Sequence, residues 1–240
     1  MKSASIFERT EKKYVITVSQ MEKLLEYAQG RIKPDEFGES TIRSLYLDTD
    51  DFRLIRNSID KPVYKEKLRL RSYTKADENT TVFLELKKKF DGVVYKRRER
   101  MTYGEAENYF YNKVKPKDTQ IMREIDWTMN FYKGLSPKML VIYDRQAFYG
   151  CDDDDLRITF DRNLRYRADE LNFTTDAYGE SILSQELCVM EIKVLWSMPI
   201  WLCNALNELK IYPSSFSKYG TAYTIEQTKS KNTKEERTCA

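Results

Sequence analysis

The sequence contains no histidine among its 240 residues. A Ser-His-Asp triad, a Cys-His dyad and a histidine-ligated zinc site are therefore excluded, because each of them needs an imidazole. Cysteines are few as well. Cys151, Cys188, Cys203 and Cys239 are far apart, with no Cys-x-x-Cys pair. This spacing argues against a zinc ribbon or a redox motif and is typical of reduced cytosolic thiols.

The chain also lacks a long apolar run. Its first residues, MKSASIFERTEKKY, do not form the apolar core of a signal peptide. The nearest candidate for a membrane span, residues 187–206, is interrupted by Glu191 and Lys193. A helix needs roughly 18 or more apolar residues to cross a bilayer. We therefore expect a cytoplasmic protein that does not insert directly into a membrane.

Neither sign of charge is in large excess. Lysine and arginine total 41, against 38 aspartate and glutamate, for a net charge of +3. So small a surplus predicts no general attraction to nucleic acid, and any basic site must be local. With 41% hydrophobic residues and no repeat or Pro-rich linker, we expect a single domain over residues 1–227. The polar tail at 228–240 is expected to be disordered.

Capping residues and turn signals predict antiparallel strands with helices between them. One helix is expected from Ser19, which with Glu22 forms a capping box, to about residue 30. Another begins at Thr102, which pairs with Glu105, and ends near Asn112. Further helices are expected at 118–133 and 197–209. Strands are expected at residues 8–17, 40–49, 62–73, 80–90, 93–102, 138–150, 155–164 and 183–196.

The Asp-Gly pair at residues 91–92 predicts a hairpin with a two-residue turn. Such a turn sets the cross-strand pairs, which are Phe90 with Val93, Lys87 with Lys96, and Glu85 with Arg98. Two lysines directly opposite each other destabilise a sheet by up to about 1 kcal/mol. Either water screens these charges or an anion binds between them.

Several strands carry charged residues on one face and apolar residues on the other. In KEKLRLRSY, residues 65–73, Leu68 and Leu70 alternate with cations, and similar alternation recurs at 82–89, 93–100, 142–145, 157–159 and 191–194. Two interpretations remain open. The charged faces lie in water, as is common, or the sheet closes into a barrel with its helices outside and the charges inside. Enclosed cations would need a polyanion such as linked phosphates, together with a few carboxylates and a metal.

The segments ERTEKKYVI, SLYLDTDDFRL, EKLRLRSY, VFLELKKKFDGVVYKRR, YDRQAF, LRITFDRNL, MEIKV and SSFSKYG follow one another along the chain. In this order they resemble the VTC (vacuolar transporter chaperone) polyphosphate polymerase domain of the triphosphate tunnel metalloenzymes, across about residues 7–223. The resemblance implies an α+β fold with a closed eight-stranded antiparallel barrel and helices packed outside. It also implies transfer of the γ-phosphoryl group of ATP onto a polyphosphate chain, with Mn²⁺ or Mg²⁺ as cofactor.

The resemblance further implies roles for individual residues. The catalytic cations that hold the triphosphate would be Lys13, Arg69, Arg71, Lys87, Lys96 and Arg98. The other substrate-binding residues would be Tyr143, Arg145, Arg157, Lys193, Ser217 and Lys218. Glu191 corresponds to the metal-binding glutamate of the family.

This chain departs from related patterns in two ways. The hydrolytic branch of the superfamily has Glu-x-Glu-x-Lys on its first strand, whereas this chain has Arg9, Glu11 and Lys13. Loss of the first glutamate removes an expected metal ligand, which favours the polymerase branch. Eukaryotic members join the domain to membrane-spanning segments, and this sequence has none. Delivery of a product across a membrane would therefore need a membrane-protein partner.

Cations of this kind suit more than one function. A metal-dependent triphosphatase and a non-catalytic polyphosphate-binding module are the alternatives to a polymerase.

Three features are ambiguous on their own. Glu85 is either a metal ligand or, as we expect, an ion-pair partner of Arg98. The loop 152–155 is more typical of a solvated turn than of a cation site, and Tyr143 either contacts phosphate or lies buried in the wall.

Overall fold

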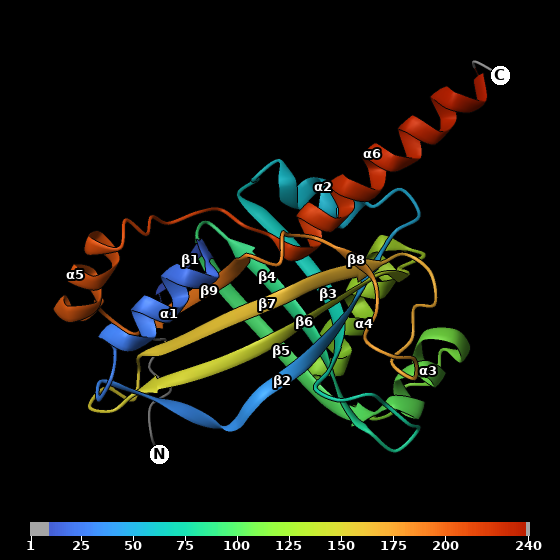
Figure 1. Cartoon of the computed structure of the whole chain (residues 1–240). Coiled ribbons are helices and arrows are strands. Elements are labelled where there is room, and N and C mark those ends of the chain that lie inside the picture. Colours follow the sequence, from blue (N-terminus) through green and yellow to red (C-terminus); the bar gives the residue numbers. More distant parts are fainter. Residues whose placement is uncertain (1–9, 239–240) are drawn as a thin grey trace. The chain divides into compact units, whose positions relative to one another are not determined.

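Figure 1 shows the computed structural model, which describes residues 10–238, with side chains as far as Lys231. Arg9 and Cys239 lie outside the described residues. The elements are β1 (Thr10–Thr17), α1 (Val18–Tyr27), β2 (Ile32–Asp48), α2 (Arg53–Ile59), β3 (Tyr64–Ser72), β4 (Thr81–Phe90), β5 (Val93–Thr102), α3 (Tyr103–Asn112), α4 (Gln120–Tyr132), β6 (Ser136–Gly150), β7 (Arg157–Arg167), β8 (Glu180–Ser181), β9 (Leu187–Val194), α5 (Ile200–Glu208) and α6 (Lys218–Thr238). Helices and antiparallel strands together confirm the α+β part of the prediction.

The strands form one nine-stranded sheet in the order β1-β9-β7-β6-β2-β3-β4-β5, with β8 paired to β7. Within residues 10–238, β1 and β5 are the two ends of this order and do not pair with each other. The prediction of a closed eight-stranded barrel is therefore wrong, because the sheet is open. Side-chain alternation determines which residues share a face of a strand, whereas closure depends on which strands become neighbours.

The chain groups into two compact units. One unit comprises residues 1–40, 143–164 and 183–216, and the other comprises residues 41–142, 165–182 and 217–240. We call them the β1–β9 unit and the β3–β5 unit, after strands that lie wholly in each. The prediction of a single domain over residues 1–227 stays a prediction.

In the β1–β9 unit, helices α1 and α5 cover the apolar face of β1 and β9. Tyr14 and Ile192 are buried on the strands, and Leu24, Leu202 and Leu206 are buried on the helices. Figure 1 shows α1 and α5 close together. The helix predicted at 197–209 corresponds to α5, which is slightly shorter and buries Leu202, Ala205 and Leu206.

Helix α1 begins two residues earlier than predicted. Its capping box is formed by Thr17 and Gln20, in which the Thr17 hydroxyl accepts a hydrogen bond from the Gln20 N–H at 3.0 Å. The Gln20 side chain accepts in return from the Thr17 N–H at 3.0 Å. Both this pair and Ser19 with Glu22 fit the capping pattern. The spacing alone did not distinguish between them.

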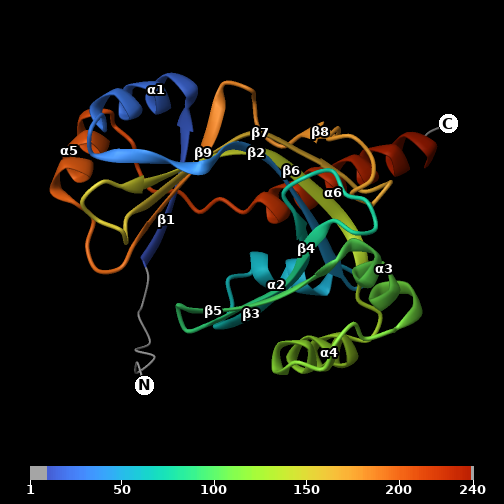
Figure 2. The same cartoon turned by 90° about the horizontal axis from the view of Figure 1, so that it is seen from below.

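In the β3–β5 unit, α3 and α4 pack against the apolar face of the meander formed by β3, β4 and β5 (Figure 2). The core there includes Leu68, Leu84 and Leu86 on the strands, with Met122 and Ile125 on α4. The predicted second capping box and the end of that helix at residue 112 are both confirmed. Helix α4 has Thr119 as its N-cap and therefore begins slightly later than predicted.

The hairpin between β4 and β5 has the predicted register. Phe90 pairs with Val93, Lys87 with Lys96, and Glu85 with Arg98. The turn residues Asp91 and Gly92 have φ angles of 43° and 83°. Positive φ at both turn residues is what the two-residue turn of a right-twisted hairpin requires.

Four features were not predicted: α2, the first part of β2, the two-residue strand β8, and α6. Helix α2 follows Phe52, whose side chain makes no capping hydrogen bond. Instead, the carboxylate of Asp48 accepts from the N–H groups of Leu54 and Ile55 at 2.8 and 3.0 Å. Asp48 lies six and seven residues before the N–H groups that it caps, a longer separation than in a local cap. The capping pattern therefore did not indicate helix α2. Helix α6 includes residues 228–238, and the disorder predicted for the tail stays a prediction.

Candidate functional site

The first candidate site is one face of the meander β3–β4–β5, which we call the cationic face. The hydrogen-bonded register sets its side chains in rows across the strands. The rows are Lys65, Lys89 and Val94; Lys67, Lys87 and Lys96; Arg69, Glu85 and Arg98; and Arg71, Phe83 and Arg100. Since paired residues and alternate residues along a strand share a side, all of them lie opposite the leucine core.

The row of Lys67, Lys87 and Lys96 sets three lysines side by side across three strands. Neighbouring strands lie about 4.8 Å apart, and like charges in this arrangement oppose folding. The Lys67 Nζ atom donates to the Ser217 hydroxyl at 3.1 Å, and the Lys96 Nζ atom lies 2.6 Å from Glu85 Oε1. The sheet thus concentrates positive charge here at a cost in stability.

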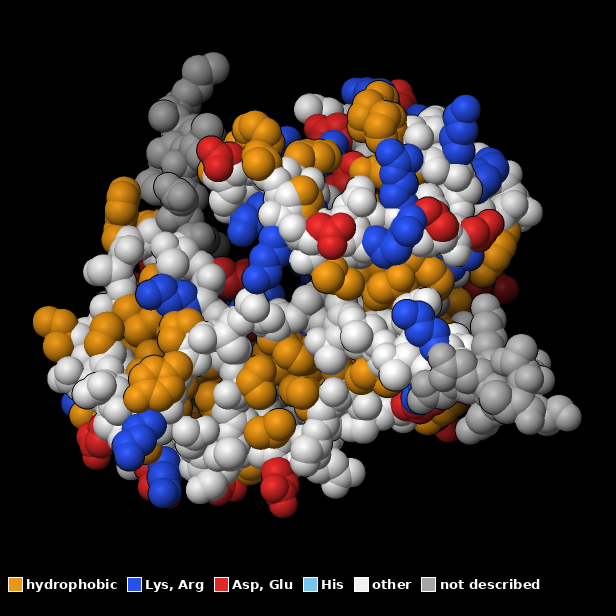
Figure 3. All heavy atoms as spheres, turned by 90° about the horizontal axis from the view of Figure 1, so that it is seen from above, with side chains coloured by type: hydrophobic (Ala, Val, Ile, Leu, Met, Phe, Trp, Pro, Cys, Tyr) orange, Lys and Arg blue, Asp and Glu red, His pale blue; other side chains and the backbone are white. Residues whose placement is uncertain are grey.

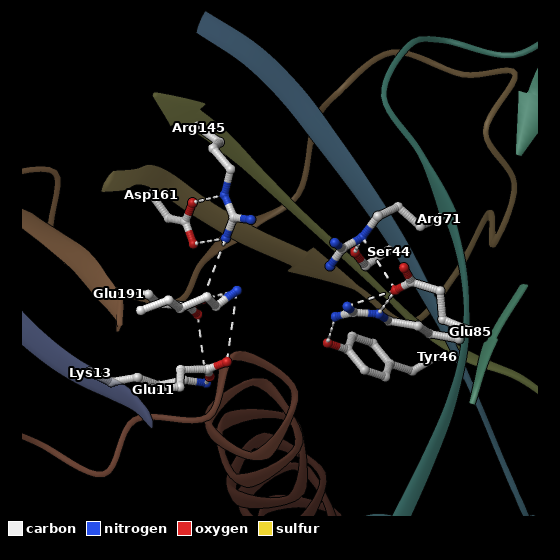
Figure 4. A network of polar contacts seen from close by, with 11 residues as sticks. Glu11, Lys13, Ser44, Tyr46, Arg71, Glu85, Arg145, Asp161 and Glu191 are labelled. Carbon is white, nitrogen blue, oxygen red and sulfur yellow. Dashed lines mark hydrogen bonds and ion pairs between the residues drawn. The ribbon is translucent and has the colours of Figure 1, made fainter. Parts of the chain in front are cut away.

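Glu85 lies among the cations of this face and is 1% exposed. Arg69 Nε donates to Glu85 Oε2 at 2.8 Å, and Arg71 Nε lies 3.9 Å from the same oxygen (Figure 4). Arg98 Nε lies 3.2 Å from Oε1. The predicted ion pair between Glu85 and Arg98 is therefore confirmed. It is one contact in a cluster where a single carboxylate faces four cations.

The cluster shifts the pKa values of its members. Burial would raise the pKa of Glu85, but Arg69, Arg71 and Lys96 outweigh burial and hold it well below its usual value. Burial lowers the pKa of Lys96, and Glu85 offsets only part of this effect. Glu85 is thus an internal anion at neutral pH and neutralises part of the positive charge around it.

Two residues of β2 extend the cationic face. Ser44 pairs with Arg71 and Tyr46 with Arg69 in the β2–β3 register. Arg71 Nε donates to the Ser44 hydroxyl at 3.4 Å, and Arg69 Nη1 donates to the Tyr46 hydroxyl at 3.3 Å (Figure 4). Sequence reasoning missed both residues, because the β2–β3 register is not determined by a short turn.

The second candidate site lies in the β1–β9 unit. We call it the β1–β9 network and define it by Glu11, Lys13, Arg145, Asp161, Glu191 and Lys193. In the β1–β9 register, Lys13 lies opposite Glu191 and Glu11 lies opposite Lys193. Lys13 Nζ is 3.3 Å from Glu11 and 3.6 Å from Glu191 (Figure 4). Lys193 Nζ is 3.7 Å from Glu11 and 4.0 Å from Glu191. Acidic and basic groups therefore alternate.

Arg145 joins this network from β6. Its Nε and Nη2 atoms donate to the two oxygens of Asp161 at 2.6 and 2.8 Å, and Nη2 lies 3.9 Å from Glu191 Oε2. The guanidinium lies over the Tyr143 ring, 5.2 Å from its centroid. Tyr143 is 2% exposed, which agrees with the buried alternative for that residue. Asp161 was missed, because one aspartate in a strand gives no sequence signal for such a partner.

Arg157 and Thr159 on β7 lie beside the network in register, opposite Lys193 and Glu191 respectively. Arg157 Nη2 is 3.8 Å from Asp35, and its guanidinium lies 4.9 Å from the centre of the Tyr149 ring. The buried hydroxyl of Thr159 has no hydrogen-bond partner among the described residues. An oxygen without a partner next to Glu191 is a position where a ligand could bind.

The fit of Mn²⁺ or Mg²⁺ to Glu191 depends on the oxygens around it. Carboxylate and hydroxyl oxygens suit these ions, and Mg²⁺ commonly takes one or two carboxylates together with phosphate oxygens. Among the side chains described, those of residues 10–231, no three acidic or cysteine groups gather closely enough to hold an ion by themselves, and this includes the loop 152–155. Glu191 and Thr159 therefore fit an ion that arrives with phosphate ligands, and do not fit a resident ion.

The predicted site residues divide between the two units. The β3–β5 unit contains Arg69, Arg71, Lys87, Lys96, Arg98, Ser217 and Lys218. The β1–β9 unit contains Lys13, Tyr143, Arg145, Arg157, Glu191 and Lys193. On the face shown in Figure 3, basic side chains are interspersed with acidic and apolar ones.

Comparison with known proteins agrees with the sequence resemblance. The model of the VTC domain family matches residues 8–226. A crystal structure from Bacillus halodurans, described as a "putative adenylate cyclase", has a TM-score of 0.54 at 13% identity and covers 88% of this chain and 95% of that one. A protein from Pyrococcus horikoshii has a TM-score of 0.45 at 12% identity, covering 91% and 99%. Another protein described as a "putative adenylate cyclase", from Vibrio parahaemolyticus, has a TM-score of 0.45 at 14% identity and covers 90% of this chain and 98% of that one.

Among the described residues, no helix has the length and apolar character that crossing a membrane requires.

Proposed function

Because the chain belongs to the VTC domain family, we propose that it is a phosphotransferase that moves the γ-phosphoryl group of ATP onto a polyphosphate chain. The observation that supports this most is the cationic face of β3, β4 and β5. There, three lysines lie abreast and four arginines and lysines surround one carboxylate.

The spacing of these charges favours linked phosphates over a single small anion. Neighbouring positions of this face lie about 4.8 Å apart across the strands and about 6.7 Å apart along each strand, and most of them carry a cation. A compact anion can contact only one or two of them, whereas a chain of phosphates presents charge over the whole face. Arginine binds phosphate oxygens with a flat fork, and lysine adds a compact charge. ATP and polyphosphate both carry such chains.

Phosphoryl transfer needs the attacking and leaving oxygens in line and the negative charge neutralised, and it needs little covalent chemistry from the protein. In this proposal Arg69, Arg71, Lys96 and Arg98 exchange part of their contact with Glu85 for phosphate oxygens. The attacking group is a terminal phosphate of the acceptor chain. Such a nucleophile is already ionised, so no histidine base is required.

The β1–β9 network has a separate role in the proposal. Glu191 would hold Mn²⁺ or Mg²⁺ that enters with the nucleotide, and the bound ion would neutralise developing charge on phosphate oxygens. Lys13, Arg145 and Lys193 would orient the Glu191 carboxylate through the ion pairs described above.

A second candidate function is binding of polyphosphate without turnover. It is favoured by the β1–β9 network, where every carboxylate is already paired with a cation. Metal binding there would have to compete with these ion pairs, whereas an anion at the cationic face competes with a single carboxylate, Glu85, for four cations.

Incubation of the full chain with ATP and Mn²⁺, with and without a short polyphosphate primer, tests the proposal. Growth of long phosphate chains, resolved by gel electrophoresis, is the expected result. Release of inorganic phosphate without chain growth would identify a triphosphatase. Saturable binding of polyphosphate without consumption of ATP would identify the binding module, and neither turnover nor binding would reject all three functions.

A further inference from the structure

A buried chain of contacts leads from the start of α6 to the cationic face, all within the β3–β5 unit. Its innermost member is Asp48, which is 0% exposed. The Asp48 carboxylate accepts from the N–H groups of Thr49, Leu54 and Ile55 at 2.8 to 3.0 Å. It also accepts from the hydroxyl of Tyr219 on α6 at 3.0 Å. A buried carboxylate that receives this many hydrogen bonds is fixed in position.

Tyr219 continues the chain through its ring. It is 2% exposed and stacks on the ring of Tyr46, with centroids 4.3 Å apart and an interplanar angle of 13°. The Tyr46 hydroxyl accepts from Arg69 Nη1 at 3.3 Å, and the Arg69 guanidinium lies 6.0 Å from the centre of the Tyr46 ring. Tyr46 and Arg69 are also direct partners in the β2–β3 register. Arg69 is therefore held by Tyr46 from β2 and by Glu85 from β4.

A second contact joins α6 to the same face. Ser217, just before α6, accepts from Lys67 Nζ at 3.1 Å and from the N–H of Gly220 at 3.1 Å. The first turn of α6 is thus tied to β3 directly through Ser217 and indirectly through Tyr219 and Tyr46. These ties make the conformation of two cations depend on the docking of α6.

We propose that Tyr46 and Tyr219 are positioning residues for Arg69, and that the docked first turn of α6 keeps the guanidinium in its phosphate-binding orientation. This inference rests on the proposed function, because it assumes that Arg69 binds phosphate. An arginine side chain loses rotamer entropy when it is fixed. Contacts that fix it before the ligand arrives remove this cost from binding.

Packing alone does not account for the two hydroxyl groups. Phenylalanine at either position would retain the stacked rings, while Asp48 would lose a donor and Arg69 an acceptor. Burial, with Asp48 beside it, raises the pKa of Tyr219 above its usual range, so the phenol keeps its proton and remains a donor. The hydroxyl of Tyr46 is what links the stack to the cationic face.

A double-mutant cycle in the full chain tests the inference. Binding of inorganic tripolyphosphate is measured by calorimetry at low ionic strength for wild type, Tyr46→Phe, Arg69→Ala and the double variant. Tyr46→Phe should weaken binding roughly five- to tenfold in the wild-type background, since it removes a hydrogen bond to a charged group. In the Arg69→Ala background it should change binding by less than about twofold, because its effect passes through Arg69.

Tyr219→Phe and Tyr219→Leu extend the test to α6. The leucine variant removes the stacking as well as the hydroxyl, so it should weaken binding more than the phenylalanine variant does. Tyr166→Phe is the matched control, because it removes another hydrogen bond from a tyrosine hydroxyl to α6, that to Glu226, without a path to Arg69. Its tripolyphosphate affinity should equal that of wild type. Thermal melts of each variant verify that it is folded.

Several results would overturn the inference. An equal loss in both backgrounds would mean that Tyr46 acts elsewhere. No loss from Tyr46→Phe, with a clear loss from Arg69→Ala, would reject the positioning role and leave the proposed function intact. No loss from Arg69→Ala would reject phosphate binding at this face, and the positioning role with it. A loss in Tyr166→Phe equal to that in Tyr219→Phe would mean that general loosening of α6 is responsible.

Discussion

The cationic face and the β1–β9 network use the same residue types in opposite proportions. On the cationic face, one buried carboxylate, Glu85, is outnumbered by the cations around it. In the β1–β9 network, acidic and basic residues alternate and each carboxylate has a basic neighbour. A surplus of one sign within a sheet opposes folding and is relieved by a ligand, whereas a balanced network is stable by itself. The proposed function therefore assigns phosphate binding to the cationic face and orientation of a metal-binding group to the β1–β9 network.

Replacement of Glu191 by alanine should give the largest effect and tests the balanced region. We expect turnover of ATP to fall about a thousandfold, because a metal that neutralises transition-state charge contributes several kcal/mol. Affinity for tripolyphosphate without metal should change less than about threefold. Steady-state assays over a Mn²⁺ titration and calorimetry measure the two quantities.

Glu39→Ala is the matched control for Glu191→Ala. It removes an acidic side chain of the same unit that pairs with Arg162, and it should leave turnover unchanged. Unchanged turnover in Glu191→Ala at every metal concentration would remove Glu191 from the proposed mechanism.

The double variant Arg69→Ala/Arg71→Ala tests the cationic face. We expect affinity for tripolyphosphate to fall about a hundredfold, because two charge-assisted contacts are lost. The remaining affinity should depend less on salt, since fewer charges are left to screen. Arg123→Ala, which removes an exposed arginine of α4, should bind as wild type does. Wild-type affinity in the double variant would exclude the cationic face as the phosphate site.

Glu85→Gln tests how far the Glu85 carboxylate offsets the surplus of positive charge on the cationic face. The pKa of Glu85 lies below the ordinary value of 4.5, so its stabilisation is complete above about pH 4.5 and is lost as the pH falls toward the lowered pKa. At neutral pH the variant should lose about 2 kcal/mol of unfolding free energy. The difference from wild type should shrink on acidification below pH 4.5.

Urea unfolding at pH values between about 3 and 7 measures the loss in Glu85→Gln. Glu124→Gln is the control, since it pairs with Arg97 at the surface and should cost less than about 1 kcal/mol. A difference between Glu85→Gln and wild type that did not vary with pH would contradict the assigned pKa shift.

Local features of this fold were predictable from sequence. The turn at Asp91 and Gly92 determined the β4–β5 register, and with it the pairing of Glu85 with Arg98. The capping box of Thr102 determined the start of α3. These features depend on residues within a few positions of one another, where turn and cap geometry leaves few alternatives.

Non-local features were not predictable in the same way. Tyr219 and Asp48 are 171 residues apart in the chain, and no spacing rule links them. The partner of Arg145 is Asp161 on a neighbouring strand, and nothing in the sequence distinguishes it from other aspartates. Closure of the sheet is also a non-local feature, since it depends on whether the two end strands pair. The roles of the predicted site residues stay predictions.

Strand β5 stands at one end of the strand order, so one side of its backbone has no neighbouring strand within residues 10–238. An unpaired strand of this length invites the strand of another molecule to add to it. Its run Lys96, Arg97, Arg98, Glu99 and Arg100 opposes such addition through mutual repulsion and a strongly held hydration layer. Substitutions that neutralise these charges in order to test phosphate binding would therefore also remove protection against self-association.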